Sequence, residues 1–326
     1  MKGGGIMMKN KTLITCMIFF AISLALSEGT YAQEERLKGE INWVGGYISG
    51  VGYATATPTG NKAKDRLSVL RAAEVMAQRA LVETIQGVRI DSETIVENMM
   101  LRDDVVRSRV QGVIKGAQIV SRNVEWIDGA PLGTVEMRVC MTATAPGCKS
   151  PNSLMGILPV EHKKEPVHAP AQNFTSKPLP PETEKKDETA KPEVQAAESR
   201  KPAIISYDST KPVTGIVINL EGKYFERELL PIVVTEGEGG AYLTVYSAKN
   251  VKPPVIRTYG VVRYADSIEH AVKIQYIGNN IIVIPAMTVT RENMIVIPVE
   301  DAKLVRETTR HGNDYLGDAK VVISSR

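Results

Sequence analysis

The spacing of apolar residues over 62–86 is the strongest local signal in the chain. Apolar side chains recur there at steps of three and four, with lysines, arginines and glutamates between them, which predicts one long amphipathic helix. Thr59-Gly60-Asn61 is a turn and a candidate helix cap, and Gly87 closes the helix. The face predicted to point inward comprises Ala63, Leu67, Leu70, Ala73, Ala77, Leu81, Thr84 and Ile85.

Short β-prone runs surround this helix. The predicted strands are 40–57, 88–90, 118–126 and 134–143, and a second helix is predicted over 91–116. Asp103-Asp104 is a candidate interruption of that second helix. The resulting order, β-α-β-α-β-β, predicts an amino-terminal domain with two helices on a small sheet, and the fold class is therefore α+β.

The carboxy-terminal part of the chain has a β-rich pattern. Val213–Leu220 is interpreted as an alternating strand, and glycines at 237, 239 and 240 predict a hairpin over 231–247. Pro298 favours a helix that begins at 299 and runs to 308, because proline is tolerated at a helix start. A final strand is predicted at 320–324. This domain is expected to be α+β or sandwich-like.

A change of composition separates the two domains. Residues 161–201 hold six prolines, eight lysines and arginines, and eight aspartates and glutamates. Such a segment buries too little apolar surface to fold, and its prolines favour extended chain, so the linker is expected to separate the domains and give the second one reach. The predicted divisions are a signal peptide (1–32), a first domain (33–150), a disordered Pro/Lys/Glu linker (151–205) and a second domain (206–326).

The amino terminus has the pattern of an export signal. Lys9 and Lys11 precede an apolar run over 13–26, and a small residue, Ala32, precedes an acidic segment. This predicts a secretory signal peptide cleaved after Ala32, which places the protein in the periplasm. The alternative is an uncleaved anchor, but the run is shorter than the roughly 20 residues that span a bilayer. Met1, Met7 and Met8 are alternative starts.

Because an exported protein enters an oxidising compartment, its cysteines are candidates for a disulfide. Cys16 lies too early in the apolar run to carry a lipid anchor, which leaves Cys140 and Cys148. In an oxidising compartment these two predict a disulfide around the turn Pro146-Gly147. Free thiols and a redox pair are the alternatives, although the spacing is not C-x-x-C.

Several short motifs of the first domain carry a resemblance. Gly50-Val51-Gly52-Tyr53-Ala54 precedes Arg71-Ala72-Ala73-Glu74, then Ile85-Gln86-Gly87-Val88-Arg89-Ile90 and Val113-Ile114-Lys115-Gly116-Ala117. Over 38–145 this succession resembles the small bacterial outer-membrane lipoprotein family, whose domain is similar to the amino-terminal domain of flagellar assembly protein T. The resemblance implies an exported envelope protein, with outer-membrane or flagellar basal-body components as candidate partners, and it supplies no catalytic residues.

The carboxy-terminal region carries a second resemblance. Thr214-Gly215-Ile216-Val217-Ile218, Thr258-Tyr259-Gly260 and the closing run from Asp318 to Ile323 are similar to a module of long, uncharacterised relatives, over 213–326. The chain departs from the lipoprotein family because it lacks a placed lipidation cysteine, and from the flagellar protein because it lacks a middle domain.

Composition narrows the function classes. A net charge of +3 provides no field to recruit nucleic acid, and 5% aromatic residues leave few stacking platforms for bases or sugars. Three cysteines and four histidines offer little for a zinc site. No cofactor, metal or catalytic residue is therefore predicted.

Four features of the sequence are candidate sites. The glycine run 45–52 matches no nucleotide-binding spacing and is interpreted as bulges or close backbone packing. The basic start of the long helix is interpreted as a solvated face, and the acidic group of the second helix as a weak cation candidate. The histidines have no catalytic spacing. The basic residues at the start of the long helix are Lys62, Lys64, Arg66 and Arg71. The acidic group comprises Glu97, Asp103 and Asp104, and the histidines are His162, His168, His270 and His311.

The sequence thus predicts a periplasmic, non-enzymatic scaffold or interaction protein of the cell envelope, with a flagellum-associated role as one form of it. The alternatives are a module that binds peptidoglycan or another glycan, and an enzyme with an unrecognised site.

Overall fold

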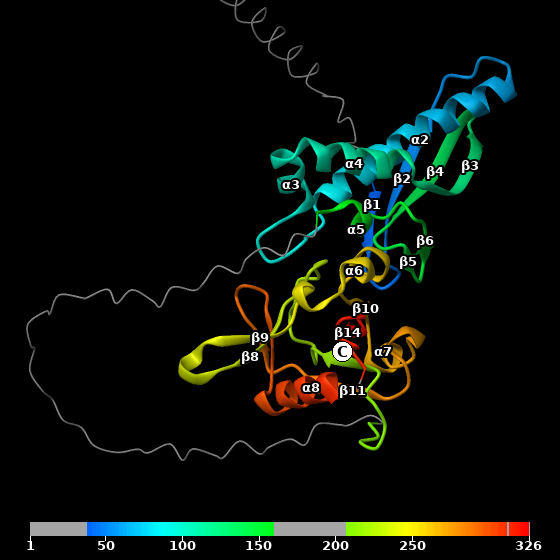
Figure 1. The fold of residues 1–326 in the computed structure, drawn as a ribbon. Coiled ribbons are helices and arrows are strands. Elements are labelled where there is room, and N and C mark those ends of the chain that lie inside the picture. Colours follow the sequence, from blue (N-terminus) through cyan, green and yellow to red (C-terminus); the bar gives the residue numbers. More distant parts are fainter. Residues whose placement is uncertain (1–37, 160–206, 312, 326) are drawn as a thin grey trace, which may run out of the picture. The chain divides into compact units, whose positions relative to one another are not determined.

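The computed structural model describes residues 38–159, 207–311 and 313–325. They belong to one compact unit, with a first lobe (38–159) and a second lobe (207–325). Both lobes combine helices and strands, so the α+β class is confirmed (Figure 1). The predicted signal peptide, its cleavage after Ala32 and the linker from 160 onward lie outside the described residues, as do His162 and His168. Among the helices that the structure describes, none combines the length and apolarity needed to cross a bilayer.

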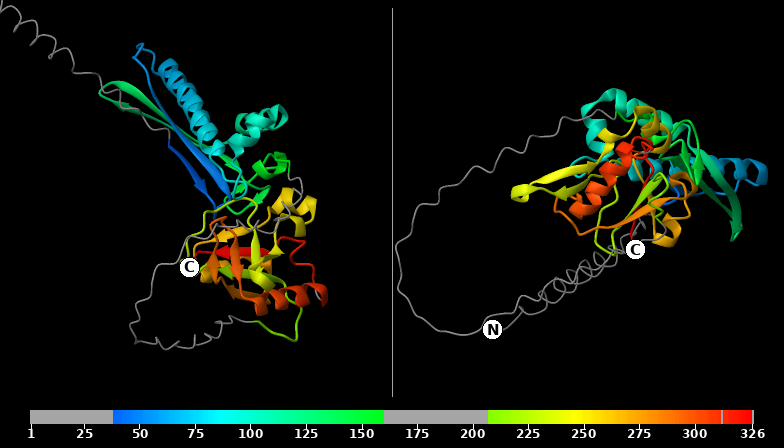
Figure 2. Two further views of the ribbon diagram at one scale, coloured as in Figure 1. Left: turned by 90° about the vertical axis from the view of Figure 1, so that its left-hand side faces the viewer. Right: turned by 60° about the horizontal axis from the view of Figure 1, so that its bottom comes forward.

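The first lobe is built on one antiparallel sheet with the order β1-β2-β4-β3. Its strands are β1 (Lys38–Asn42), β2 (Tyr47–Thr55), β3 (Gln118–Ile127) and β4 (Ala130–Cys140). The region predicted as one strand over 40–57 is two strands, because Asn42 closes a turn between them: its Oδ1 accepts a hydrogen bond from Gly45 N at 2.7 Å. Helices cover one face of this sheet and leave the other open (Figure 2).

The long helix α2 (Lys62–Gln86) confirms the strongest sequence signal. Its buried face includes Val69, Ala73, Ala77 and Leu81. The prediction is wrong in the first turns, where Ala63 is exposed and Leu67 is 70% exposed. Asp65 is buried there instead, because its carboxylate accepts hydrogen bonds from the backbone and hydroxyl of Thr59 and fixes the start of the helix in that rotation.

Two glycines of β2 let α2 approach the sheet closely. A Cβ atom on Gly50 would lie 2.6 Å from Ala77 O, and one on Gly52 would overlap the backbone of Ala73 and Ala77. Gly50 and Gly52 of the glycine run therefore pack closely against the helix backbone, and the interpretation as close backbone packing is confirmed for these two positions.

The region between α2 and β3 departs from the prediction. Residues 88–90 are not a strand but make a single bridge between Arg89 and Ile95. The second predicted helix is two helices, because Asp103 ends one and caps the next by accepting a hydrogen bond from Val105 N at 2.7 Å. These are α3 (Val96–Arg102) and α4 (Asp104–Lys115).

The first lobe also extends beyond its predicted end. Leu154, Met155 and Leu158 are buried, and α5 (Leu154–Ile157) belongs to the lobe. The prediction that the linker begins at 151 is therefore wrong for these residues, because three apolar side chains anchor them to the core. The lobe also contains β5 (Thr144–Ala145) and β6 (Cys148–Lys149).

The second lobe contains two sheets. One is wholly parallel, with the order β10-β14-β7-β11, and the other has the order β12-β13-β8-β9. The strands are β7 (Gly215–Asn219), β8 (Val233–Glu236), β9 (Tyr242–Tyr246), β10 (Arg263–Ala265), β11 (Ile281–Pro285), β12 (Thr288–Val289), β13 (Ile295–Ile297) and β14 (Val321–Ser324). The helices are α6 (Pro253–Tyr259), α7 (Ile268–Ala271) and α8 (Val299–His311), with 3₁₀ turns η1 (Glu238–Gly240), η2 (Ala248–Asn250) and η3 (Gln275–Ile277).

Several predictions for this lobe are confirmed. The β8–β9 pair is the predicted hairpin, α8 starts at the predicted position and continues to 311, and β14 is the predicted last strand. The interpretation of Val213–Leu220 as alternating is wrong, because all five residues of β7 are buried. One hydrophobic core contains Ile48 and Leu81 of the first lobe together with Ile218 and Tyr246 of the second. The linker therefore does not keep the described lobes apart.

Candidate functional site

A hollow of about 40 Å³ lies where the two lobes meet. The first lobe lines it with Trp43, Met141 and Thr142, and the second lobe with Glu228 and the segment 259–264. A hollow of this size has room for two or three water molecules, which is far less than a small-molecule pocket offers.

Aromatic contacts hold the two walls of the hollow together. The rings of Trp43 and Tyr264, one from each lobe, meet edge to face with centroids 5.4 Å apart, and Phe225 stacks on the other side of Tyr264. The Tyr264 hydroxyl donates to Glu228 O at 2.6 Å and accepts from Glu228 N at 3.1 Å. Burial raises the pKa of Tyr264 far above its usual range. The phenol is therefore a structural group that fixes residue 228.

The Glu228 side chain is the most perturbed carboxyl of the described residues. It is only 1% exposed, and its Oε2 has no hydrogen-bond partner among them. Burial raises the pKa of Glu228 to about 8, with further repulsion from Asp91 and Glu226 that a hydrogen bond from Asn293 and the charge of Arg89 oppose. At neutral pH the group is thus mainly a neutral carboxylic acid.

The chain around Glu228 binds directly to the first lobe. Leu229 N donates to Arg89 O at 3.1 Å, and Leu230 N donates to Ile90 O at 2.8 Å. An ion pair of 2.6 Å joins Arg89 Nη2 to Glu226 Oε2. The sequence predicts a strand over 88–90, but Arg89 and Ile90 instead offer their carbonyl groups to the other lobe, while Val88 O accepts from Val96 N of its own lobe.

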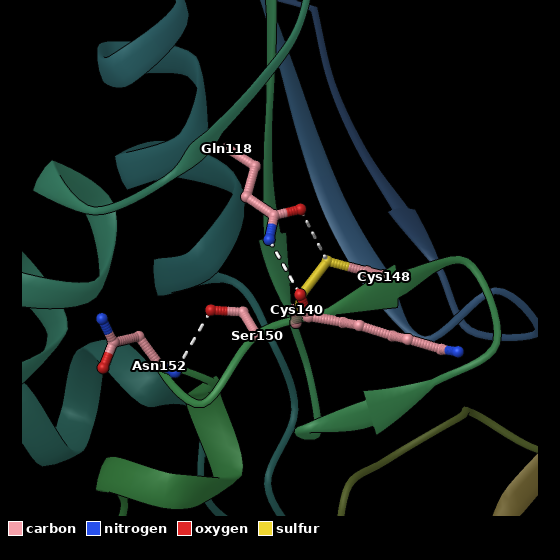
Figure 3. Close-up of a disulfide and its surroundings, with 6 residues drawn as sticks. Gln118, Cys140, Cys148, Ser150 and Asn152 are labelled. Atoms are coloured by element: carbon pink, nitrogen blue, oxygen red, sulfur yellow. Dashed lines mark hydrogen bonds between the residues drawn. A yellow bond between two sulfur atoms is a disulfide. The ribbon is translucent and has the colours of Figure 1, made fainter.

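The predicted disulfide lies in the same junction. Cys140 and Cys148 are bonded, as predicted, and they close the loop that carries β5 and β6 (Figure 3). Gln118 Nε2 donates to Lys149 O at 2.9 Å beside the disulfide. Within the closed loop, Thr144 Oγ1 donates to Thr258 O of the second lobe at 3.0 Å. The disulfide therefore stiffens a loop that contacts the second lobe.

A half-buried cation, Arg263, completes the junction. The guanidinium carbon of Arg263 lies 4.7 Å from the ring centre of Tyr276, which stacks on Tyr259, and Arg263 Nη2 donates to Thr144 O at 3.5 Å. Burial lowers the pKa of Arg263, and it raises that of Tyr276 to about 12.

The buried side-chain nitrogen and oxygen atoms without a hydrogen-bond partner in the described part of the chain all belong to this region. They are Arg89 Nε, Glu228 Oε2 and Arg263 Nε. Buried polar atoms of this kind call for a specific partner such as ordered water, and the hollow has room for one. The geometry is that of a polar joint between lobes rather than of a cleft that encloses a substrate.

The structure assigns the other predicted residues local roles. Asp103 caps α4, and Asp104 pairs with Arg107 at 2.9 Å. Lys62 lies over the ring of Trp126, at 5.6 Å from its centre. The backbone N–H of His270 donates to the cap residue Ser267. No group of three or more metal-ligating side chains occurs within the ranges that the structure describes, and the side chain of His311 lies outside them.

Comparison with known proteins adds one match. Residues 215–325 match the family model of the second domain of Treponema pallidum Tp0624. The match covers the second lobe, about a third of the chain, so it shows what this lobe is similar to. No curated protein matches the chain.

Proposed function

We propose that this protein is an exported, non-enzymatic interaction protein of the bacterial cell envelope, which works in the periplasm and presents its two lobes to envelope partners as one unit. The observation that carries the proposal is the disulfide in the loop between the lobes. Structural disulfides persist in oxidising compartments such as the periplasm, and they are rare where thiols are kept reduced.

Two further features support a role in binding rather than catalysis. The hollow at the junction is too small for a substrate, and its aromatic and backbone contacts join the lobes. Large apolar side chains are also exposed on both lobes, with Leu101 of α3 at 69% and Met287, just before β12, at 52%. The resemblance of residues 38–145 to envelope lipoproteins points to the same compartment, with outer-membrane or basal-body components as candidate partners.

The experiment has two arms. Fractionation of cells that express the full chain, followed by thiol alkylation and mass spectrometry, is expected to find the protein in the periplasm with Cys140 and Cys148 oxidised. Photo-crosslinkers placed at Leu101 and at Met287 are expected to capture a small, reproducible set of envelope proteins, with a crosslinker at the exposed, polar Glu83 of α2 as the matched control. Cytoplasmic protein with free thiols would contradict export. Capture of peptidoglycan fragments without proteins would favour the glycan-binding alternative.

A further inference from the structure

The strand β3 is the least protected element of the first lobe. It stands at the edge of the sheet and pairs with β4 along one side. Nine of its ten residues are exposed, whereas β4 alternates between buried and half-buried positions. No backbone hydrogen bond from another described segment reaches its outer side. Apolar side chains are among the exposed ones, with Val120 at 45% and Trp126 at 40%.

The sequence of β3 defends this edge only in part, through the charges of Arg122 and Glu125 and a bulge between Ile119 and Ser121. Proteins usually blunt an edge strand by making it short or by placing lysine or proline on it, because unpaired backbone groups are a template for another strand. At ten residues β3 is longer than a typical strand of five or six, and it contains neither lysine nor proline. The opposite edge strand, β1, has five residues.

The order of side chains along β3 is self-complementary. An apolar pair stands at each end, Ile119-Val120 and Trp126-Ile127, with mostly polar residues around Asn123 between them. Two-fold symmetric interfaces require a patch that is complementary to itself. Antiparallel pairing of two copies about Asn123 would set Val120 opposite Trp126, Ser121 opposite Glu125, and Arg122 opposite Val124.

We propose that two copies of the chain associate through β3, antiparallel about a two-fold axis at Asn123, so that their four-stranded sheets form one continuous sheet of eight strands. In this register neither charge of the strand faces a like charge, whereas an axis at Arg122 would oppose two guanidinium groups. The register shift between Ile119 and Ser121 ends the regular ladder, so the pairing covers residues 120–126.

The neighbouring helix leaves space for the second copy. Helix α2 packs mainly on β2 and β4 and approaches β3 at fewer positions. Two of its contacts with β3 are made by long side chains: Glu74 to Arg122 at 3.6 Å, and Lys62 over Trp126. These flexible groups can stay in place when a strand is added in the plane of the sheet. The inference needs no envelope partner and is independent of the proposed function.

Disulfide trapping tests the register on the full chain. Residues directly opposite in an antiparallel pair have Cα atoms about 4.5–5.5 Å apart, which suits a disulfide. Asn123→Cys is expected to give a covalent dimer on oxidation. Ser121→Cys is the matched control, because the two copies of that residue would lie four positions apart, roughly 13 Å. Equal cross-linking of both variants, or of neither, would overturn the proposal.

Analytical ultracentrifugation tests the association itself. The unmodified chain is expected to sediment as a dimer. Val124→Lys would place an ammonium opposite Arg122 of the second copy and raise the dissociation constant at least about ten-fold. Val105→Lys, the same kind of change on the exposed surface of α4, should leave the dimer intact, and circular dichroism confirms that both variants fold. A monomeric wild type, or equal weakening by both variants, would contradict the inference.

Discussion

The two lobes bury their strands in different ways. In the first lobe β4 alternates between buried and half-buried residues, because α2 covers one face of an antiparallel sheet. In the second lobe β7, β13 and β14 are buried along their whole length. β7 and β14 have parallel neighbours on both sides, and central strands of this kind are covered on both faces, which removes the alternation. The first lobe thus depends on the fit of one helix to one sheet face, and the second on a continuous apolar centre.

The largest predicted effect tests that fit. Gly52→Ala adds a Cβ that overlaps the backbone of Ala73 and Ala77, so α2 must move, and we expect a loss of about 3 kcal/mol in the free energy of unfolding. Urea titration measures it. Gly112→Ala in α4 is the control: nothing lies within 4 Å of its Cβ, and a gain of roughly 0.5–1 kcal/mol is expected. Equal effects would contradict the close packing.

The second effect concerns the loop at the junction. Replacing both Cys140 and Cys148 by serine opens a nine-residue loop, and we expect a loss of about 2.5 kcal/mol from the added freedom of the unfolded chain. Urea titration of the oxidised wild type and the double variant measures the difference. An unchanged midpoint would show that the disulfide does not constrain the chain.

The third effect depends on pH. The pKa of Glu228 is raised from 4.5 to about 8, so the folded state holds a proton that the unfolded chain releases, and stability falls as the pH rises from about 4.5 to about 8. Glu228→Gln stays neutral. We expect the free energy of unfolding of this variant to match that of the wild type at pH 4 and to exceed it at pH 8.5, because only the wild-type side chain releases its proton more readily when the chain unfolds. Urea titrations at pH 4 and pH 8.5 measure the difference in the free energy of unfolding between the variant and the wild type. The same difference at both pH values would contradict a buried neutral carboxyl.

The smallest effect is that of the ion pair between the lobes. Glu226→Gln removes the partner of Arg89, and because the Glu226 side chain is half exposed we expect a loss below about 1 kcal/mol. The same titrations measure it, and 0.5 M salt (ionic strength that screens exposed pairs) should shrink the difference. A loss as large as that of the disulfide would mean that the pair is buried in solution.

The features that could be predicted from the sequence are those set by the spacing of residues close together in the chain. The helix over 62–86 and the hairpin over 231–247 follow from residues close together in the chain, and the Cys140–Cys148 bond follows from elimination among three cysteines. The alternating pattern assumed for β7 failed, because burial on both faces depends on neighbours far away in sequence.

The candidate site could not be predicted for the same reason. Glu228 stands in a charged run, Glu226-Arg227-Glu228, that reads as exposed surface. It becomes buried only because Tyr264 holds its backbone and residues 88–90 of the other lobe cover it. The contact of residues 229–230 with residues 89–90 joins positions more than a hundred residues apart, and no local sequence pattern predicts it. The polar linker instead predicts two separate domains.

A double-mutant cycle between Trp43 and Tyr264 tests whether the two lobes act as one unit. The two rings touch across the junction. Unfolding free energies of the wild type, Trp43→Leu, Tyr264→Leu and the double variant are predicted to give a coupling of about 0.5–1.5 kcal/mol. Strictly additive effects would mean that the rings do not meet in solution, and would contradict the joined lobes on which the proposed function rests.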